Sequence, residues 1–136
     1  MKKLSIILSV LILLFAVSAA SAADTTTYMG LQNIKQSSTG AAAIASTLAP
    51  GIGWQLLGIR VHLSAAGGSG SLTATVDNGS GAAYDCVILT QDMTSVTDLV
   101  WSPERPMEFG PNDELDIAWP NAGTKTYGLE IIYKTF

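Results

Sequence analysis

The chain has 136 residues, of which seven are Lys or Arg and eleven are Asp or Glu, and its net charge is −4. This length suits one domain with a single hydrophobic core. The acidic balance argues against nucleic acid and against an anionic membrane surface as partners, because both require an excess of Lys and Arg to meet phosphate.

The N-terminal residues, MKKLSIILSVLILLFAVSAASA, have the features of a bacterial secretory signal peptide. Lys2 and Lys3 precede an apolar run over 4–17, and small residues follow at 20–22. The apolar run of about 14 residues is shorter than the ~20 that a spanning helix needs, which argues against a retained anchor. We therefore expect residues 1–22 to be a cleaved signal peptide. The mature chain would be secreted, extracellular or periplasmic, with no membrane insertion.

Residues 23–50 lack the clear periodicity of the rest of the chain. Ala, Ser, Thr and Gly dominate 37–53, and the alanine-rich run is too short for a helix and has no amphipathic stripe. We interpret 23–50 as an N-terminal arm or edge strand, with the extended segment over 41–48. Such an arm is a candidate for contacts between subunits.

The remaining residues, 51–136, alternate apolar and polar side chains with a period of two, which is typical of half-buried strands. In WQLLGIRVHLS the alternation places Leu57 and Ile59 on one face, and Arg60 and His62 on the other. Further strands are predicted in SLTATVD, YDCVILTQ, LVW, MEF, LDIAW and TYGLEIIYKTF. Glycine, proline and asparagine turns separate them.

This succession of short strands predicts an all-β fold, a single antiparallel β-sandwich over residues 51–136. The uneven turn lengths and the strong final strand favour a jelly-roll-like arrangement. An immunoglobulin-like sandwich is the alternative, although its Cys–Trp–Cys pattern is absent from the sequence.

The sequence contains few residues of the types that enzymes use for catalysis. The chain has one cysteine, Cys86, and one histidine, His62. Cys86 lies in an apolar strand pattern and is predicted to be buried, whereas His62 is predicted to face outward. No serine lies in a GxSxG context. One Cys and one His cannot supply a tetrahedral N/S zinc site, so carboxylates would have to provide most of the ligands. A glycosidase would need two carboxylates across a cleft, which a domain of this size has little area to build. We expect a non-enzymatic protein.

The segment NDELDIAWPN places three acids, Asp113, Glu114 and Asp116, within four positions. Carboxylate oxygens are the ligands that calcium prefers, so these residues are the candidate calcium ligands. Their spacing does not match an EF-hand loop. A turn that opens into a strand explains the segment equally well, with Leu115, Ile117 and Trp119 facing the core. No other cofactor is expected.

The aromatic residues raise a second function, which is carbohydrate binding through exposed rings. Trp101 and Trp119 alternate in phase with aliphatic residues, so both are expected to face the core. Trp54 follows Gly53 at the start of a strand and is the candidate for partial exposure and ligand contact. A glycan or a cell-surface partner is the alternative that this residue supports.

A resemblance to a known class of proteins lies in the strand pattern and turn style of five segments: LLGIRVHLSAAGGSGSLTATVD, AYDCVILTQDM, LVWSPERP, NDELDIAW and TYGLEIIY. The chain resembles small β-sandwich proteins of the phage virion and tail-associated type. The resemblance implies a structural or surface-attachment role and self-association into a homo-oligomer or filament. Virion proteins are assembled in the cytoplasm, so the signal peptide points instead to an exported, virion-like relative. We expect an extracellular structural or adhesion protein that acts through strand edges and surface contacts.

Overall fold

The computed structural model describes residues 24–28, 32–39 and 42–136, and the predicted signal peptide with its cleavage site lies outside them. The described residues form ten strands and one short 3-10 helix. The strands are β1 (Asp24–Tyr28), β2 (Gln32–Thr39), β3 (Ile44–Leu48), β4 (Trp54–Leu63), β5 (Ser71–Asp77), β6 (Cys86–Asp92), β7 (Asp98–Trp101), β8 (Met107–Phe109), β9 (Glu114–Trp119) and β10 (Tyr127–Thr135), and the helix is η2 (Ala82–Tyr84). No helix in these ranges is both long and apolar enough to cross a bilayer.

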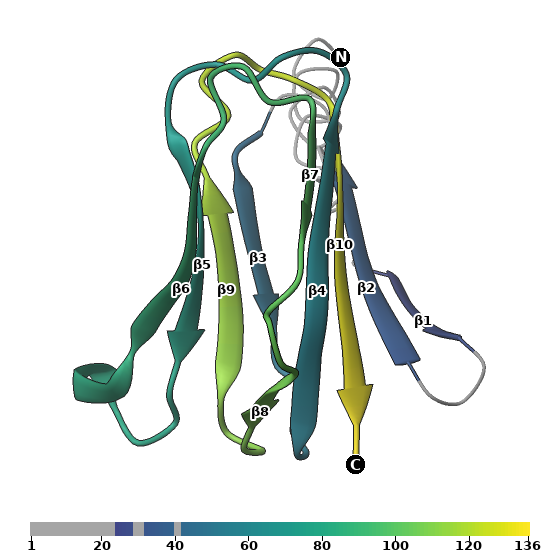
Figure 1. The fold of residues 1–136 in the computed structure, drawn as a ribbon, viewed down its shortest axis with the longest axis vertical. Coiled ribbons are helices and arrows are strands. Elements are labelled where there is room, and N and C mark those ends of the chain that lie inside the picture. The colour runs from purple at the N-terminus through teal and green to yellow at the C-terminus, as the bar shows by residue number, and fades with distance from the viewer. Residues whose placement is uncertain (1–23, 29–31, 40–41) are drawn as a thin grey trace, which may run out of the picture.

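The strands form two antiparallel sheets that pack face to face (Figure 1). The first sheet has the order β1-β2-β10-β4-β7, and β8 pairs with the lower part of β4. The second sheet has the order β3-β9-β5-β6. The prediction of an all-β antiparallel sandwich is therefore confirmed.

The core lies between the two sheets because inward-facing residues alternate with outward-facing ones along nearly every strand. In β9 and β10 the alternation is regular, and Leu115, Ile117 and Trp119 are all buried as predicted. The largest side chains of the core come from both sheets: Trp54, Trp119, Ile44, Leu56, Ile59, Leu63, Leu72, Met93, Leu115, Ile117, Leu129 and Ile131.

A β-bulge in β4 changes which residues of that strand enter the core. Ile132 of β10 pairs with Gly58, and the next residue pairs with Leu56, so Leu57 has no partner on β10. Leu57 is only half-buried, whereas Leu56 is fully buried. The expectation that Leu57 shares the face of Ile59 is wrong, because one extra residue in a strand shifts the alternation by one position.

Residues 32–48 contribute a strand to each sheet. β2 pairs with β10 along Tyr127–Tyr133, and β3 pairs with β9 as an edge strand of the second sheet. Residue 51, where the sandwich is expected to begin, therefore lies in the turn between β3 and β4. The described strands before that turn, β1, β2 and β3, are part of the two-sheet structure.

Candidate functional site

The three acidic residues of the candidate calcium site diverge in the structure. The Asp113 carboxylate accepts two hydrogen bonds from backbone amides, that of Gly79 at 3.1 Å and that of Gly110 at 2.8 Å. Asp116 accepts a hydrogen bond from the hydroxyl group of Thr47 on the neighbouring strand β3. Within the described residues, no three His, Cys, Asp or Glu side chains converge as a metal site would require.

Asp113 instead joins two loops at one end of the sandwich. It connects the turn before β9 to the β5–β6 loop, where Gly79 packs against Asn112. A Cβ added to Gly79 would lie 2.5 Å from that of Asn112, so only glycine allows this approach. The Asp113 carboxylate therefore accepts hydrogen bonds that hold two loops together. A turn predicted from the sequence does not reveal this role.

Trp54, the candidate for ligand contact, is fully buried, with none of its surface exposed. Its ring stacks on Phe109 at a centroid distance of 4.3 Å and meets Tyr133 edge-on at 6.2 Å. The expectation of partial exposure is wrong. β4 pairs with β8 and β10 at this position, so the strand start lies inside the core rather than at its margin.

The other tryptophans follow the alternation. Trp119 is buried, and Trp101 is half-buried and packs against the core. Among the described residues, the buried indole nitrogen of Trp119 has no hydrogen-bond partner. Among the side chains whose exposure is described, Tyr84 and Phe136 are the aromatic residues with large exposed surfaces, and they belong to η2 and to the C-terminus.

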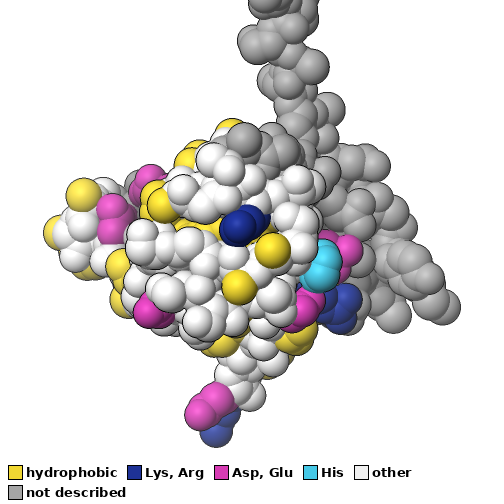
Figure 2. All heavy atoms as spheres, turned by 90° about the horizontal axis from the view of Figure 1, so that it is seen from above, with side chains coloured by type: hydrophobic (Ala, Val, Ile, Leu, Met, Phe, Trp, Pro, Cys, Tyr) yellow, Lys and Arg dark blue, Asp and Glu magenta, His cyan; other side chains and the backbone are white. Residues whose placement is uncertain are grey.

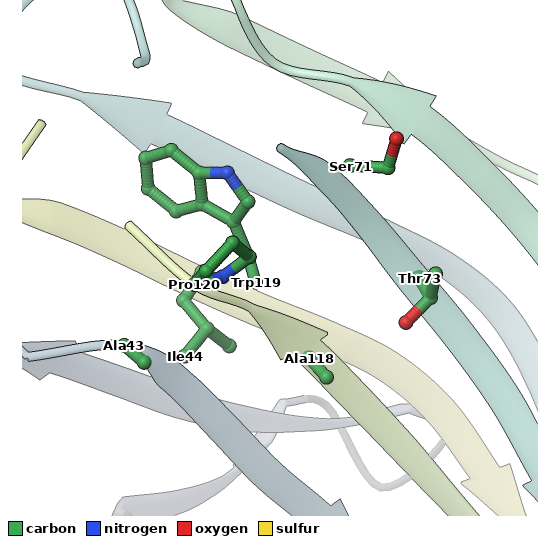
Figure 3. Close-up of a pocket in the computed structure, with 7 residues that line it drawn as sticks. All are labelled: Ala43, Ile44, Ser71, Thr73, Ala118, Trp119 and Pro120. Atoms are coloured by element: carbon green, nitrogen blue, oxygen red, sulfur yellow. The ribbon is translucent and has the colours of Figure 1, made fainter. Parts of the chain in front are cut away.

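A shallow depression of about 370 Å³ lies beside Trp119 on the second sheet (Figure 3). Its wall consists of residues on three neighbouring strands and the adjoining loops: Ala43, Ile44, Ser71, Thr73, Ala118, Trp119 and Pro120. The lining offers two hydroxyl groups and no charged group. It therefore supplies no acid, base or activated nucleophile for catalysis.

A second hollow, of about 320 Å³, lies on the first sheet across β4, β7 and β10. The Nδ1 atom of His62 lies 2.7 Å from Oδ1 of Asp98, and a guanidinium nitrogen of Arg60 lies 3.6 Å from a carboxylate oxygen of Glu130. Gly128 pairs with His62, and open space surrounds the position where its Cβ would stand. The hollow therefore lies where Gly128 has no side chain to fill the space between these two side-chain pairs.

His62 is exposed, as the strand alternation predicts. It lies on β4 in the first sheet, whereas Cys86 lies on β6 in the second. The two residues that a Cys–His nucleophile would need are therefore on different sheets, and the partner of His62 is a carboxylate. That pair is solvated, and exposed ion pairs of this kind contribute little to stability.

The hydrogen bond from His62 lowers the pKa of Asp98 below its usual value, and one from Thr97 adds to this effect. A lowered pKa in the folded state means that the ionised carboxylate favours folding above the unfolded-state pKa. This contribution is lost as the pH falls through the folded-state pKa. We expect the Asp98 carboxyl to titrate below a typical Asp by NMR, and to move back towards the usual value in His62→Gln. An unchanged Asp98 titration in that variant would contradict the assignment.

Lys35 is a partly buried charged residue that the sequence does not single out. Burial lowers the pKa of its ammonium group, and the charge of Asp116 opposes that shift. Lys35 lies on β2 in the first sheet, whereas Asp116 lies on β9 next to β3. Because β2 has no clear hydrophobic alternation, the sequence offered no signal that this lysine would be partly buried near the second sheet.

Cys86 is exposed, so the prediction of a buried thiol is wrong. The residue opens β6, which is an edge strand of the second sheet. Its sequence, CVILTQD, begins with four apolar residues, yet none of the residues of β6 is buried, and Val87 is 54% exposed. The 3-10 helix η2 projects from the sandwich beside this strand, with Tyr84 68% exposed (Figure 1).

A view along the sandwich from above shows few charged side chains among uncharged and apolar ones (Figure 2). No protein-family model matches the chain, and no curated protein sequence matches it significantly. The fold and the surface geometry therefore carry the functional argument. Among the described strands, β6 is an edge strand whose apolar residues are exposed or half-buried, and natural β-proteins usually protect such edges.

Proposed function

We propose that the chain is an exported, non-enzymatic structural or adhesion protein, a subunit of an extracellular or cell-surface assembly. It acts through strand-edge and surface contacts with other chains. The observation that carries this proposal is β6, an edge strand that begins with four apolar residues and has no buried residue. Exposed, uncharged strand edges are templates for pairing with another chain.

The strand order supports a finer description of the fold. Eight of the strands form two four-stranded sets, with the order β2-β10-β4-β7 in one sheet and β3-β9-β5-β6 in the other. This arrangement agrees with a jelly roll, the architecture of many capsid and lectin domains. It is consistent with the resemblance to virion-type sandwiches, here in an exported chain, and such domains commonly serve by surface contact rather than by catalysis.

The carbohydrate-binding alternative rested on Trp54, and it loses that residue because the indole is fully buried. A sugar platform requires an aromatic face that solvent can reach. Among the described side chains, the exposed aromatics Tyr84 and Phe136 lie on η2 and at the end of the chain rather than on a shared sheet face. We therefore favour assembly.

The proposal predicts self-association of the mature chain, residues 23–136. Size-exclusion chromatography with light scattering, over a wide concentration range, is expected to give a mass that rises above that of one chain. The rise should be reversible on dilution, because the contacts are non-covalent. A mass of one chain throughout the range would contradict a homotypic assembly, and would leave only a heterologous partner to support the proposed role.

A further inference from the structure

The strand edges of the sandwich differ in how well they are protected. At the β7/β8 edge of the first sheet, the strands have four and three residues, and the segment between them contains Pro103 and Pro106. Asp98 and Glu108 add charge to the same edge. Short strands, prolines and charged residues are the features by which proteins prevent edge-to-edge pairing, so this edge is protected.

The β3 edge of the second sheet is also protected. β3 (Ile44–Leu48) is only five residues long, and Pro50 follows two residues after its end. A short strand followed by a proline limits the length over which this edge can pair with another chain. At the remaining edge of the first sheet, β1 is five residues long and begins with Asp24.

The β6 edge lacks these protections over most of its length. No charged residue and no proline occurs over 86–91, and Asp85 and Asp92 lie outside or at the end of that run. β6 does contain a bulge at Ile88, where its register with β5 shifts. The bulge leaves a regular segment, Leu89–Asp92, in continuous register with β5. This segment and Val87 are therefore available to a further strand.

We propose that β6 pairs antiparallel with β6 of a second copy of this chain, about a two-fold axis, and so joins two second sheets into one. This inference rests on the proposed function and names its partner. A two-fold contact places the same surface on both sides, so the surface must be compatible with itself. An uncharged run meets this condition, because no like charges oppose each other at its centre.

The exposure of side chains on β6 also supports a second copy of this chain as the partner. Val87, Ile88 and Leu89 remain exposed or half-buried in one chain, with Ile88 and Leu89 already packed against the edge of the core. A strand added beside β6 would cover these side chains, since cross-strand neighbours pack on both faces of a sheet. Asp85 and Asp92 are exposed, so they can stay hydrated at the two ends of the contact.

Cys86 gives a direct test, because it is the only cysteine of the chain and lies exposed on β6. A nitroxide attached to its thiol in the mature chain reports the distance between copies by electron paramagnetic resonance. Antiparallel pairing keeps both labels within roughly 25 Å of each other, from a strand rise of about 3.3 Å per residue. We expect dipolar coupling in that range, lost on dilution with unlabelled chain.

Two matched variants separate the edge from other contacts. Val87→Lys places a charge on β6, and Val100→Lys places the same charge on β7, where Val100 is 77% exposed. Val87→Lys is expected to weaken association by about tenfold or more, whereas Val100→Lys should leave it unchanged. Both side chains are exposed, so both variants should keep the circular dichroism and unfolding midpoint of the parent chain.

The outcomes distinguish this inference from the proposed function. Association without coupling between Cys86 labels, and with no effect of Val87→Lys, would overturn β6 pairing while an assembly through another edge still stands. A chain that stays monomeric would overturn β6 pairing and remove the support for self-assembly. Association, coupling and selective loss in Val87→Lys together would support the pairing.

Discussion

Replacing Trp54 by alanine is expected to lower the free energy of unfolding by about 3–5 kcal/mol. The side chain is fully buried, stacks on Phe109 and meets the ring of Tyr133. Its indole nitrogen also donates a long hydrogen bond of 3.4 Å to the backbone oxygen of Asp113. Removing it leaves a cavity where β4, β8 and β10 meet, and the surrounding strands cannot collapse to fill it.

Equilibrium unfolding in urea, followed by circular dichroism, measures this effect as a lower midpoint with an unchanged slope. A loss of this size is a large part of the 5–15 kcal/mol that holds a typical domain together. Val100→Ala is the matched control, because Val100 is 77% exposed and its truncation should change stability by less than about 0.5 kcal/mol. A Trp54→Ala variant as stable as that control would contradict the burial of Trp54.

Replacing Asp113 by alanine is expected to cost about 2–3 kcal/mol, the second largest effect of a single change. The carboxylate accepts hydrogen bonds from the backbone amides of Gly79 and Gly110, and it holds two loops together. Without it, both amides lose a charged acceptor. Hydrogen–deuterium exchange should show faster exchange at these two amides, while the core strands keep their protection.

Glu114→Gln is the control for Asp113, because Glu114 is the next residue in the chain and pairs with Asp77. Removing one of two facing negative charges should leave stability unchanged or slightly higher. The same variants test the calcium hypothesis. We expect added calcium to leave the melting temperature of the parent chain unchanged. A calcium-dependent rise that disappears in Asp113→Ala would instead identify a calcium site.

The segment NDELDIAWPN shows which structural features a local sequence pattern predicts and which it does not. The alternation of Leu115, Ile117 and Trp119 predicted their burial correctly, because a strand has a period of two and one buried face. The pattern also separated Asp116 from these residues. It did not reveal that Asp113 accepts hydrogen bonds from two loops, since one of its partners, Gly79, lies 34 positions away in the sequence.

The errors at Leu57, Trp54 and Cys86 share a physical origin. A bulge shifts the alternation of β4 at Leu57, and the pairing of β4 with β8 and β10 encloses Trp54. Cys86 lies in an apolar run that the fold places at a sheet edge rather than in its centre. An apolar sequence indicates that burial is favourable, but it does not indicate which part of the structure covers the apolar residues.

The sequence by itself therefore determined the strand class, the position of most strands and the inward face of those with regular alternation, because these depend on local periodicity. Only the tertiary structure decided the strand order, the bulge in β4, the partners of Asp113 and the exposure of β6. Those features depend on pairing between residues far apart in the chain, which no local pattern encodes. The exposure of the apolar residues of β6 is one of these features, and the proposed assembly depends on this strand edge.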